Sequence, residues 1–204
     1  MKKFLLTIAS VLLASMASAQ VSVQNLDVVV SNPSASQQSQ AVKKVAKVAN
    51  NQRWLGYYNS DSWAGEGQGM GVPSYPGDNQ VAIYLTKDIL KSYVGMKVVG
   101  MRFAVCEEIG SSTAFFKKIE NDAPGADLRT KELSTTALGW NEVMFTEPVE
   151  ITGDEEFAAG YTYTQIGDQY NGKAFPFSAV AEGIENQYLF IYCLDPKTGD
   201  TGWK

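Results

Sequence analysis

The stretch from Lys97 to Cys106 reads KVVGMRFAVC and decides the fold class. Apolar side chains occupy every second position in it, namely Val99, Met101, Phe103 and Val105. Arg102 interrupts the other face, and this period of two is typical of a strand that packs one side against a core. Similar runs, separated by Gly, Pro, Asn and Asp clusters, predict strands over residues 53–58, 80–85, 113–119, 127–133, 141–145, 157–165, 175–181 and 188–194. The sequence therefore predicts an all-β protein, an antiparallel, jelly-roll-like β-sandwich.

Two short helices are expected beside these strands. Small apolar residues recur at helical spacing between residues 42 and 49, which predicts a short N-terminal helix that ends at Asn50-Asn51. Residues 87–93 form the second candidate, a helical turn between two strands. Thr86 is placed to cap it, and Gly95 lies just beyond its end.

The first 19 residues have the pattern of a secretory signal peptide. Lys2-Lys3 precede an apolar run from Phe4 to Met16, and Ala17-Ser18-Ala19 supplies a cleavage site before Gln20. Residues 20–52 are interpreted as a linker that contains the short helix, although Val28-Val29-Val30 could add a strand; residues 53–204 form the sandwich. The chain is expected to be secreted, periplasmic or at the cell surface.

The composition excludes several functional classes. The chain has no histidine, so the base of Ser-His-Asp and Cys-His catalysis and the imidazole of the usual zinc and copper sites are missing. The net charge of −5, more negative once Lys2 and Lys3 leave with the signal, disfavours nucleic-acid partners. No later segment holds about 18 consecutive apolar residues, so no membrane insertion is expected after signal cleavage.

Neighbouring acids could in principle supply a glycosidase pair. They stand at Glu107-Glu108 and at Asp154-Glu155-Glu156, beside glycines. Acidic residues in such places are ordinarily solvated turn residues, and the sequence does not set the separation that glycoside hydrolysis requires. We therefore expect that the chain is not an enzyme.

Aromatic residues gather around a glycine-rich loop over residues 64–71. A nucleotide-binding loop would have to open a helix, which this context does not provide. Aromatic rings beside amides and acids are suited to stacking on sugar rings. The candidate ligand-binding residues are therefore Trp63, Tyr75, Tyr58, Asp61 and Asp78. Trp54 in a strand and Trp140 at a strand start are expected to lie in the core instead.

No pattern in the chain calls for a cofactor, and no metal-binding motif is recognised. Calcium stays open as a possibility, because loops rich in acids and glycine suit oxygen ligation. Its ligands would come from Asp61, Glu66 or Asp78.

Cys106 and Cys193 are the only cysteines. Cys193 shares a strand face with Leu189 and Ile191 and is expected to point inward, whereas Cys106 shares a face with Arg102 and is expected to point away from the core. An oxidising compartment permits a disulfide between them. The sequence leaves both a disulfide and two separate thiols open.

The C-terminal residues predict a sandwich that lacks its closing strand. Residues 195–202 read as a turn, and Gly202-Trp203 then resembles the start of another strand. A missing strand would expose a hydrogen-bonding edge, so truncation is expected here. The alternative is a frayed end at which Trp203 folds back onto the surface.

Several segments resemble a β-sandwich module that recurs in secreted proteins of Bacteroidetes. The resemblance spans residues 53–204 and rests on these segments: RWLGYY at 53–58, Leu90, YVGMKV at 93–98, MRF at 101–103, GWN at 139–141 and Gly160-Tyr161. It implies a module that accompanies surface adhesins or secreted peptidases, distantly similar to the adhesin modules of gingipain-type proteases. The Asp-Gly-rich calcium loops of those adhesins are absent here.

These observations favour an exported, non-enzymatic β-sandwich for adhesion, with a glycan or a surface protein as partner. The alternative is an accessory or propeptide-like module of a secreted hydrolase, either a peptidase or a glycosidase.

Overall fold

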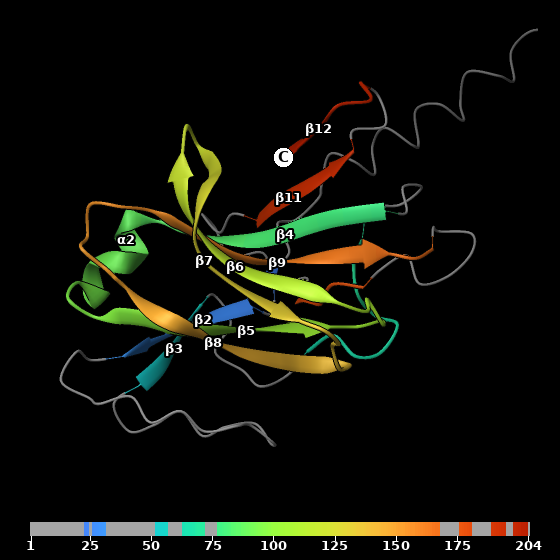
Figure 1. Cartoon of the computed structure of the whole chain (residues 1–204), viewed down its shortest axis with the longest axis horizontal. Helices are drawn as coiled ribbons and strands as arrows, with labels where there is room; N and C mark the ends of the chain where they lie inside the picture. The colour runs from blue at the N-terminus through green and yellow to red at the C-terminus, as the bar shows by residue number, and fades with distance from the viewer. Residues whose placement is uncertain are drawn as a thin grey trace, which may run out of the picture.

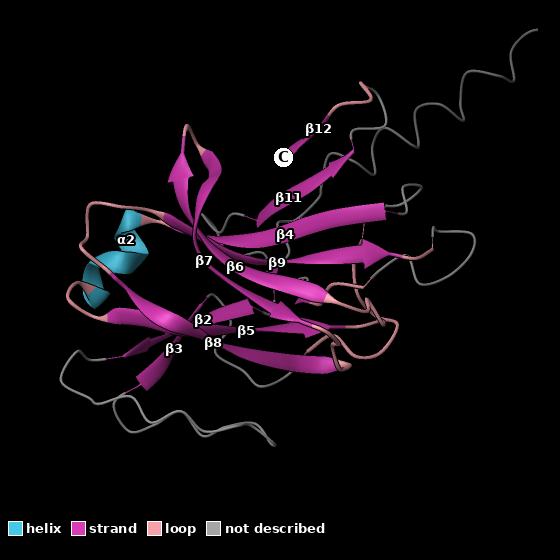
Figure 2. Ribbon diagram, in the orientation of Figure 1, coloured by secondary structure: helices cyan, strands magenta, loops and turns pink. Residues whose placement is uncertain are grey.

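Two antiparallel sheets face each other and enclose the core (Figures 1 and 2). A computed structural model describes residues 23–24, 26–31, 52–56, 63–71, 77–167, 176–180, 189–194 and 198–203. The six-stranded sheet has the order β12 (Thr201–Trp203), β11 (Leu189–Leu194), β4 (Gly77–Leu85), β9 (Phe157–Gln165), β6 (Ser112–Glu120) and β7 (Ala123–Leu133). The four-stranded sheet has the order β3 (Gln52–Gly56), β2 (Leu26–Ser31), β5 (Lys97–Val105) and β8 (Gly139–Glu150). A small ladder joins β1 (Val23–Gln24) to β10 (Ala179–Val180).

The middle of the chain is wound as nested antiparallel pairs. β6 pairs with β7, β5 with β8, and β4 with β9. The first and third pairs lie in the six-stranded sheet and the second lies in the four-stranded sheet. A long hairpin rolled up in this way gives a jelly-roll-like sandwich, which confirms the predicted fold class.

The core fills the space between the two sheets, and the alternation predicted on β5 holds for Met101, Phe103 and Val105 but not for Val99. A β-bulge between Val98 and Gly100 shifts the register, so Val98 and not Val99 belongs to the core cluster. Met101, Phe103 and Val105 are fully buried. The ring of Phe103 stacks on Tyr161 of β9 at a centroid distance of 4.1 Å, which ties the two sheets together. Burial of these large side chains is the main stabilising contribution to such a fold.

The segment that contains β2 corrects the predicted domain boundary. We interpreted residues 20–52 as a linker to which Val28-Val29-Val30 could add a strand. That strand is present as β2, and it lies between β3 and β5 in the four-stranded sheet. Val28, Val29 and Val30 are 0%, 3% and 0% exposed, because a strand inside a sheet covered on both faces can be apolar at every position. The helix predicted to end at Asn51 and the signal peptide lie outside the described residues.

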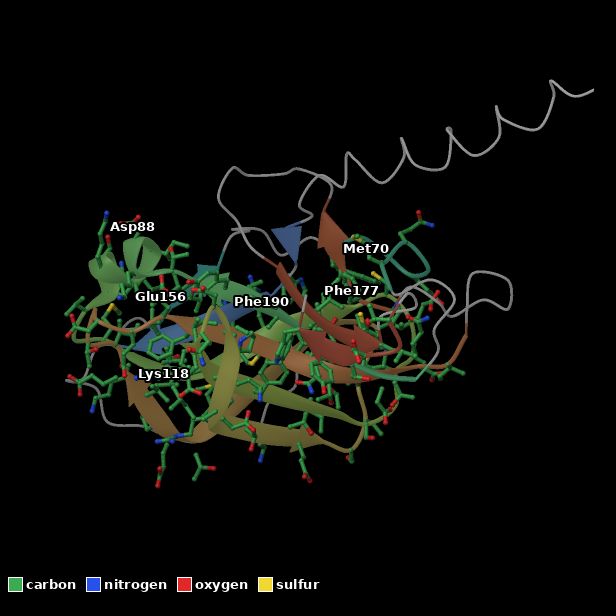
Figure 3. The ribbon with its side chains drawn as sticks, turned by 90° about the horizontal axis from the view of Figure 1, so that it is seen from above. Met70, Asp88, Lys118, Glu156, Phe177 and Phe190 are labelled. Atoms are coloured by element: carbon green, nitrogen blue, oxygen red, sulfur yellow. The ribbon has the colours of Figure 1, made fainter. Side chains whose placement is uncertain are left out.

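The helical turn between β4 and β5 is confirmed at Lys87–Leu90 (α2), followed by a 3-10 turn at Lys91–Tyr93 (η1). Thr86 is the N-cap residue, but its side chain makes no capping hydrogen bond. The backbone N–H of Lys87 instead donates to Glu156 Oε1 at 3.2 Å. Glu156 also accepts a 2.6 Å hydrogen bond from the Tyr84 hydroxyl, so it fixes this end of the sandwich (Figure 3).

At the opposite end, the glycine-rich loop is tied to the strand ends. The predicted strand over 175–181 narrows to β10, and Phe177 before it bridges to both Met70 and Val105. Met70 N–H donates to the Phe177 carbonyl at 2.7 Å, and Gly67 N–H donates to the Cys106 carbonyl at 2.9 Å. Figure 3 shows Met70 and Phe177 together, far from Asp88 in α2. The loop is part of the folded framework at this end.

The last described strand, β12, lies at the edge of the six-stranded sheet. The sequence predicted that Gly202-Trp203 begins a strand, and Thr201–Trp203 does pair with β11. Trp203 is the cross-strand partner of Tyr192. Trp203 thus reaches the outer face of the sheet, where the functional site is built.

Candidate functional site

A pocket of about 750 Å³ lies on the outer side of the six-stranded sheet, at the end where β4 begins. Most of its lining residues carry hydroxyl groups, and two carry carboxylates. The described lining residues are Asp78, Ser111, Ser112, Thr113, Glu132, Leu133, Ser134, Thr162, Tyr163 and Thr164. Such a lining offers many hydrogen-bond donors and acceptors over a small area.

Short hydrogen bonds hold the polar side chains of the pocket in place. The Thr164 hydroxyl donates to Asp78 Oδ1 at 2.7 Å, across the β4–β9 pair. The Thr113 N–H donates to Thr162 Oγ1 at 2.9 Å, and the Ser112 hydroxyl donates to the Thr162 carbonyl at 2.7 Å. The pocket wall is therefore ordered by the strand ladder itself.

A row of outward-facing residues leads from the pocket across the sheet. Thr162 on β9 is the cross-strand partner of Gln80 on β4, Gln80 is the partner of Tyr192 on β11, and Tyr192 is the partner of Trp203 on β12. The rings of Tyr192 and Trp203 are 5.3 Å apart and meet edge to face. A polar pocket and two aromatic rings thus share one row.

The adjacent row supplies an aromatic cluster. Phe115, Gly160, Ala82 and Phe190 are successive cross-strand partners on β6, β9, β4 and β11. The Trp203 ring meets Phe115 at 6.1 Å and Phe190 at 6.2 Å, so the rings reach across the small residues (Figure 3 labels Phe190). A side chain at Gly160 would stand 2.5 Å from Phe115 Cζ, and this explains the glycine.

Sequence reasoning missed this aromatic surface. Phe190 and Tyr192 alternate along one predicted strand, and this alternation was the available signal. What the sequence did not show is that β12 and β6 place Trp203 and Phe115 on the same face, since the strand order is decided by tertiary pairing.

The predicted ligand-binding residues separate in the structure. Asp78 lines the pocket, as described above. Trp63 is half-buried, and its ring lies against Gly139 at the start of β8; it is not among the described residues that line the pocket. Tyr58, Asp61 and Tyr75 lie outside the described residues, so their grouping stays a prediction.

Two of the predicted acidic residues, Glu155 and Glu156, hold other parts of the fold in place. Glu155 forms an ion pair with Lys118 at 2.9 Å, and Glu156 holds Tyr84 and α2. Glu66 is exposed, and Asp61 is not described. Within the described ranges, His, Cys, Asp and Glu side chains form no group of three that could hold a metal ion. None of the helices in those ranges is long and apolar enough to cross a membrane.

Cys106 and Cys193 are both buried, and neither forms a disulfide. Cys106 lies just beyond the end of β5 and is 0% exposed. The glycine-rich loop and the segment at Pro176 bond to its backbone and cover it, so a position away from the core does not leave it exposed. Burial raises the pKa of its thiol, although a hydrogen bond with Ser178 acts in the opposite direction.

Two tyrosines of β9 lie between the sheets. Burial raises the pKa of Tyr161 well above the ordinary value for tyrosine. Burial also raises the pKa of Tyr163, with a smaller contribution from Cys193. The Tyr161 hydroxyl is 3.5 Å from the Ala104 carbonyl, whereas the buried Tyr163 hydroxyl has no hydrogen-bond partner among the described residues.

The outer face of the four-stranded sheet carries a second aromatic arrangement. The Arg102 guanidinium lies 4.4 Å from the Trp54 ring centroid and 4.2 Å from the Trp140 centroid. Arg102 is only 3% exposed. The prediction that both tryptophans lie in the core was wrong: both are half-buried, because their strand positions alternate with the core positions.

Comparisons with known proteins give no assignment for this site. No protein-family model matches the chain, and no curated protein or solved structure matches it. The resemblance to secreted Bacteroidetes modules therefore stays a prediction.

Proposed function

We propose that this chain is an exported, non-enzymatic β-sandwich that binds a glycan or a protein at a surface through the pocket beside Asp78. The observation that carries the proposal is one continuous row of outward-facing residues. It joins Thr162 in the pocket to Tyr192 and Trp203 at the sheet edge.

This row combines the two chemistries that binding requires. Hydroxyl and carboxylate groups in the pocket donate and accept hydrogen bonds, which gives orientation and specificity. The neighbouring aromatic rings offer apolar surface with little conformational entropy to lose, because Tyr192 and Trp203 already contact each other. The pocket lies on the strands of a rigid sheet, so binding needs no large rearrangement.

A binding role also agrees with the chemistry that the chain lacks. It has no histidine to act as a general base near neutral pH. Asp78 accepts a hydrogen bond from Thr164, and Glu156 accepts hydrogen bonds from the Tyr84 hydroxyl and the backbone N–H of Lys87. These contacts support roles in orientation and packing for both acids.

The test uses residues 20–204 and surfaces coated with mucin, which presents both glycan and protein. Ser111→Trp places an indole in the pocket at an exposed position and should abolish retention on mucin. Ser92→Trp makes the same change at an exposed position in η1, at the other end of β4, and should leave retention unchanged. Thermal melting of both variants checks that they fold.

Equal retention of the two tryptophan variants would show that the pocket is not the binding site. Absence of retention on mucin, on deglycosylated mucin and on an array of oligosaccharides would reject the proposed binding function.

A further inference from the structure

Resting on the proposed binding function, we infer that the ligand is an uncharged oligosaccharide of at least two sugar rings. It runs from the pocket beside Asp78 across β4 to Tyr192 and Trp203. The inference depends on the charge of the pocket, the hydrogen-bonding capacity of its groups, and the length of the row.

The charge of the pocket disfavours acidic sugars. Asp78 and Glu132 are the charged residues among the described lining, and none of the described lining residues is basic. A sialylated or sulfated glycan would bring its own negative charge beside these carboxylates, which costs binding free energy. Recognition of such groups ordinarily uses arginine or lysine.

One basic side chain described on this face, that of Lys117, has its charge engaged elsewhere. Lys117 on β6 forms an ion pair with Asp127 at 2.8 Å and lies 5.1 Å from the centre of the Phe115 ring. Its side chain is only 14% exposed. Lys117 therefore supports the aromatic cluster and is poorly placed to receive an anionic ligand.

The polar groups that remain match sugar hydroxyls. A carboxylate accepts hydrogen bonds from two hydroxyls, and Thr164 fixes one oxygen of Asp78. The serine and threonine hydroxyls of the wall can both donate and accept. A polyhydroxylated, uncharged ring satisfies both kinds of group, whereas an apolar ligand would leave them without partners.

The length of the row requires more than one ring. Adjacent strands are about 4.8 Å apart, so Tyr192 lies about 10 Å and Trp203 about 14 Å from Thr162 along the row. A single sugar ring in the pocket cannot also cover these aromatic side chains. A linked chain can place one ring in the pocket and the apolar face of a later ring on Tyr192.

The experiment compares matched oligosaccharides on residues 20–204 by calorimetry. The probes are one neutral tetrasaccharide chosen from an array, the same chain with terminal sialic acid or sulfate, and its monosaccharide. We expect the neutral tetrasaccharide to bind, with each charged form and the monosaccharide weaker by about tenfold or more.

Two sets of variants locate these effects. The double variant Asp78→Asn, Glu132→Gln removes both carboxylates of the pocket and should reduce the difference in affinity between the neutral and the charged chains. The control double variant Asp88→Asn, Asp154→Asn removes two carboxylates at the α2 end. It changes the net charge equally and should leave that difference unchanged. Tyr192→Ala should reduce the advantage of the tetrasaccharide over shorter chains, and Tyr192→Phe should retain it. Thermal melting verifies that each variant folds.

The outcomes separate this inference from the proposed function. Equal or tighter binding of the sialylated or sulfated chain, with binding still lost in Ser111→Trp, would overturn the neutral ligand and keep the pocket. Retention on deglycosylated mucin without binding to any oligosaccharide would replace the glycan by a protein. Binding of monosaccharide and tetrasaccharide with equal affinity would overturn the extended row.

Discussion

On the outer face of the four-stranded sheet, Arg102 lies between the rings of Trp54 and Trp140, whereas on the six-stranded sheet Tyr192 and Trp203 lie beside a polar pocket. Both faces combine aromatic rings with a charged group. On the first face the guanidinium is covered by the rings, and on the second the carboxylates of Asp78 and Glu132 line a hollow. The first arrangement stabilises its own sheet, and the second is the proposed binding site.

The small residues beneath the rings explain part of this difference. Each face has one glycine in a central strand, Gly100 on β5 and Gly160 on β9, where a side chain would meet a neighbouring carbonyl. Above Gly100 lies the flexible, 48% exposed side chain of Met144. Above Gly160 lies the ring of Phe115, which is 2% exposed. The six-stranded face is therefore more closely packed where the aromatic cluster crosses it.

The largest expected effect comes from Gly160→Ala. Its added Cβ would stand 2.2 Å from the Val81 carbonyl oxygen and 2.5 Å from Phe115 Cζ, so backbone and ring must both shift. We expect a loss of about 3 kcal/mol or more in the free energy of unfolding. Urea denaturation measures this loss.

Gly100→Ala tests the same change on the other face. Its Cβ would meet the Val143 carbonyl and Met144 Sδ, and the methionine side chain can move away. We therefore expect a smaller loss in the free energy of unfolding than for Gly160→Ala. Gly202→Ala is the control, since nothing lies within 4 Å of its Cβ. If Gly100→Ala costs as much as Gly160→Ala, the proposed difference in packing between the two faces is wrong.

The next effect concerns the charges on the two faces. Arg102→Ala removes a buried cation from two rings and should cost about 2–4 kcal/mol, since a cation–π contact contributes about 1 kcal/mol when exposed and about 2 kcal/mol when desolvated. Lys117→Ala removes one cation–π contact and a partly exposed ion pair, and should cost about 1 kcal/mol. Chemical denaturation of both variants measures which one loses more unfolding free energy.

Arg102→Met separates packing from charge, because methionine retains much of the side-chain volume. A stability near that of the natural protein would show that the guanidinium contributes little, and would remove the stated contrast between the faces.

The last expected effect has the opposite sign and is a gain in stability. Tyr163 contributes to the lining of the pocket, but its side chain lies in the core, and its buried hydroxyl has no partner among the described residues. Tyr163→Phe removes an unsatisfied polar group and should stabilise the fold by about 1–2 kcal/mol while leaving the pocket hydroxyls unchanged. Thermal melting near neutral pH measures the gain, and loss of stability would show that the hydroxyl has a partner.

The pH dependence of this variant provides a second readout. Because burial raises the pKa of Tyr161 and Tyr163, the unfolded state releases these protons first as pH rises above about 10. Stability is therefore fully present below that pH and falls above it, by at most about 1.4 kcal/mol per pH unit for each tyrosine. The stability of Tyr163→Phe should therefore fall less steeply above about pH 10 than the stability of the natural protein. Tyr163→Leu is not suitable for this comparison, because it also changes the packing of the core.

The sequence predicted the strands well where alternation was strong. The predicted and observed limits of β9 are the same, and β5 differs by one residue at its end. It predicted Asp78 as a ligand-binding residue without the pocket that surrounds it. It did not predict the half-burial of Trp140, the full burial of Cys106 or the lack of a side-chain hydrogen bond at the N-cap Thr86, because burial and capping at strand and helix ends depend on segments distant in the sequence.

Composition and periodicity by themselves determined the all-β class, the lack of histidine chemistry and the positions of most strands, since these depend on local residue order. Only the tertiary structure decided that β2 enters the middle of a sheet and that Trp203 joins Phe115 and Tyr192. Strand pairing joins residues far apart in the chain, and local sequence does not specify which strands become neighbours. The candidate site is a product of that pairing, because its pocket and aromatic row draw on all six strands of one sheet.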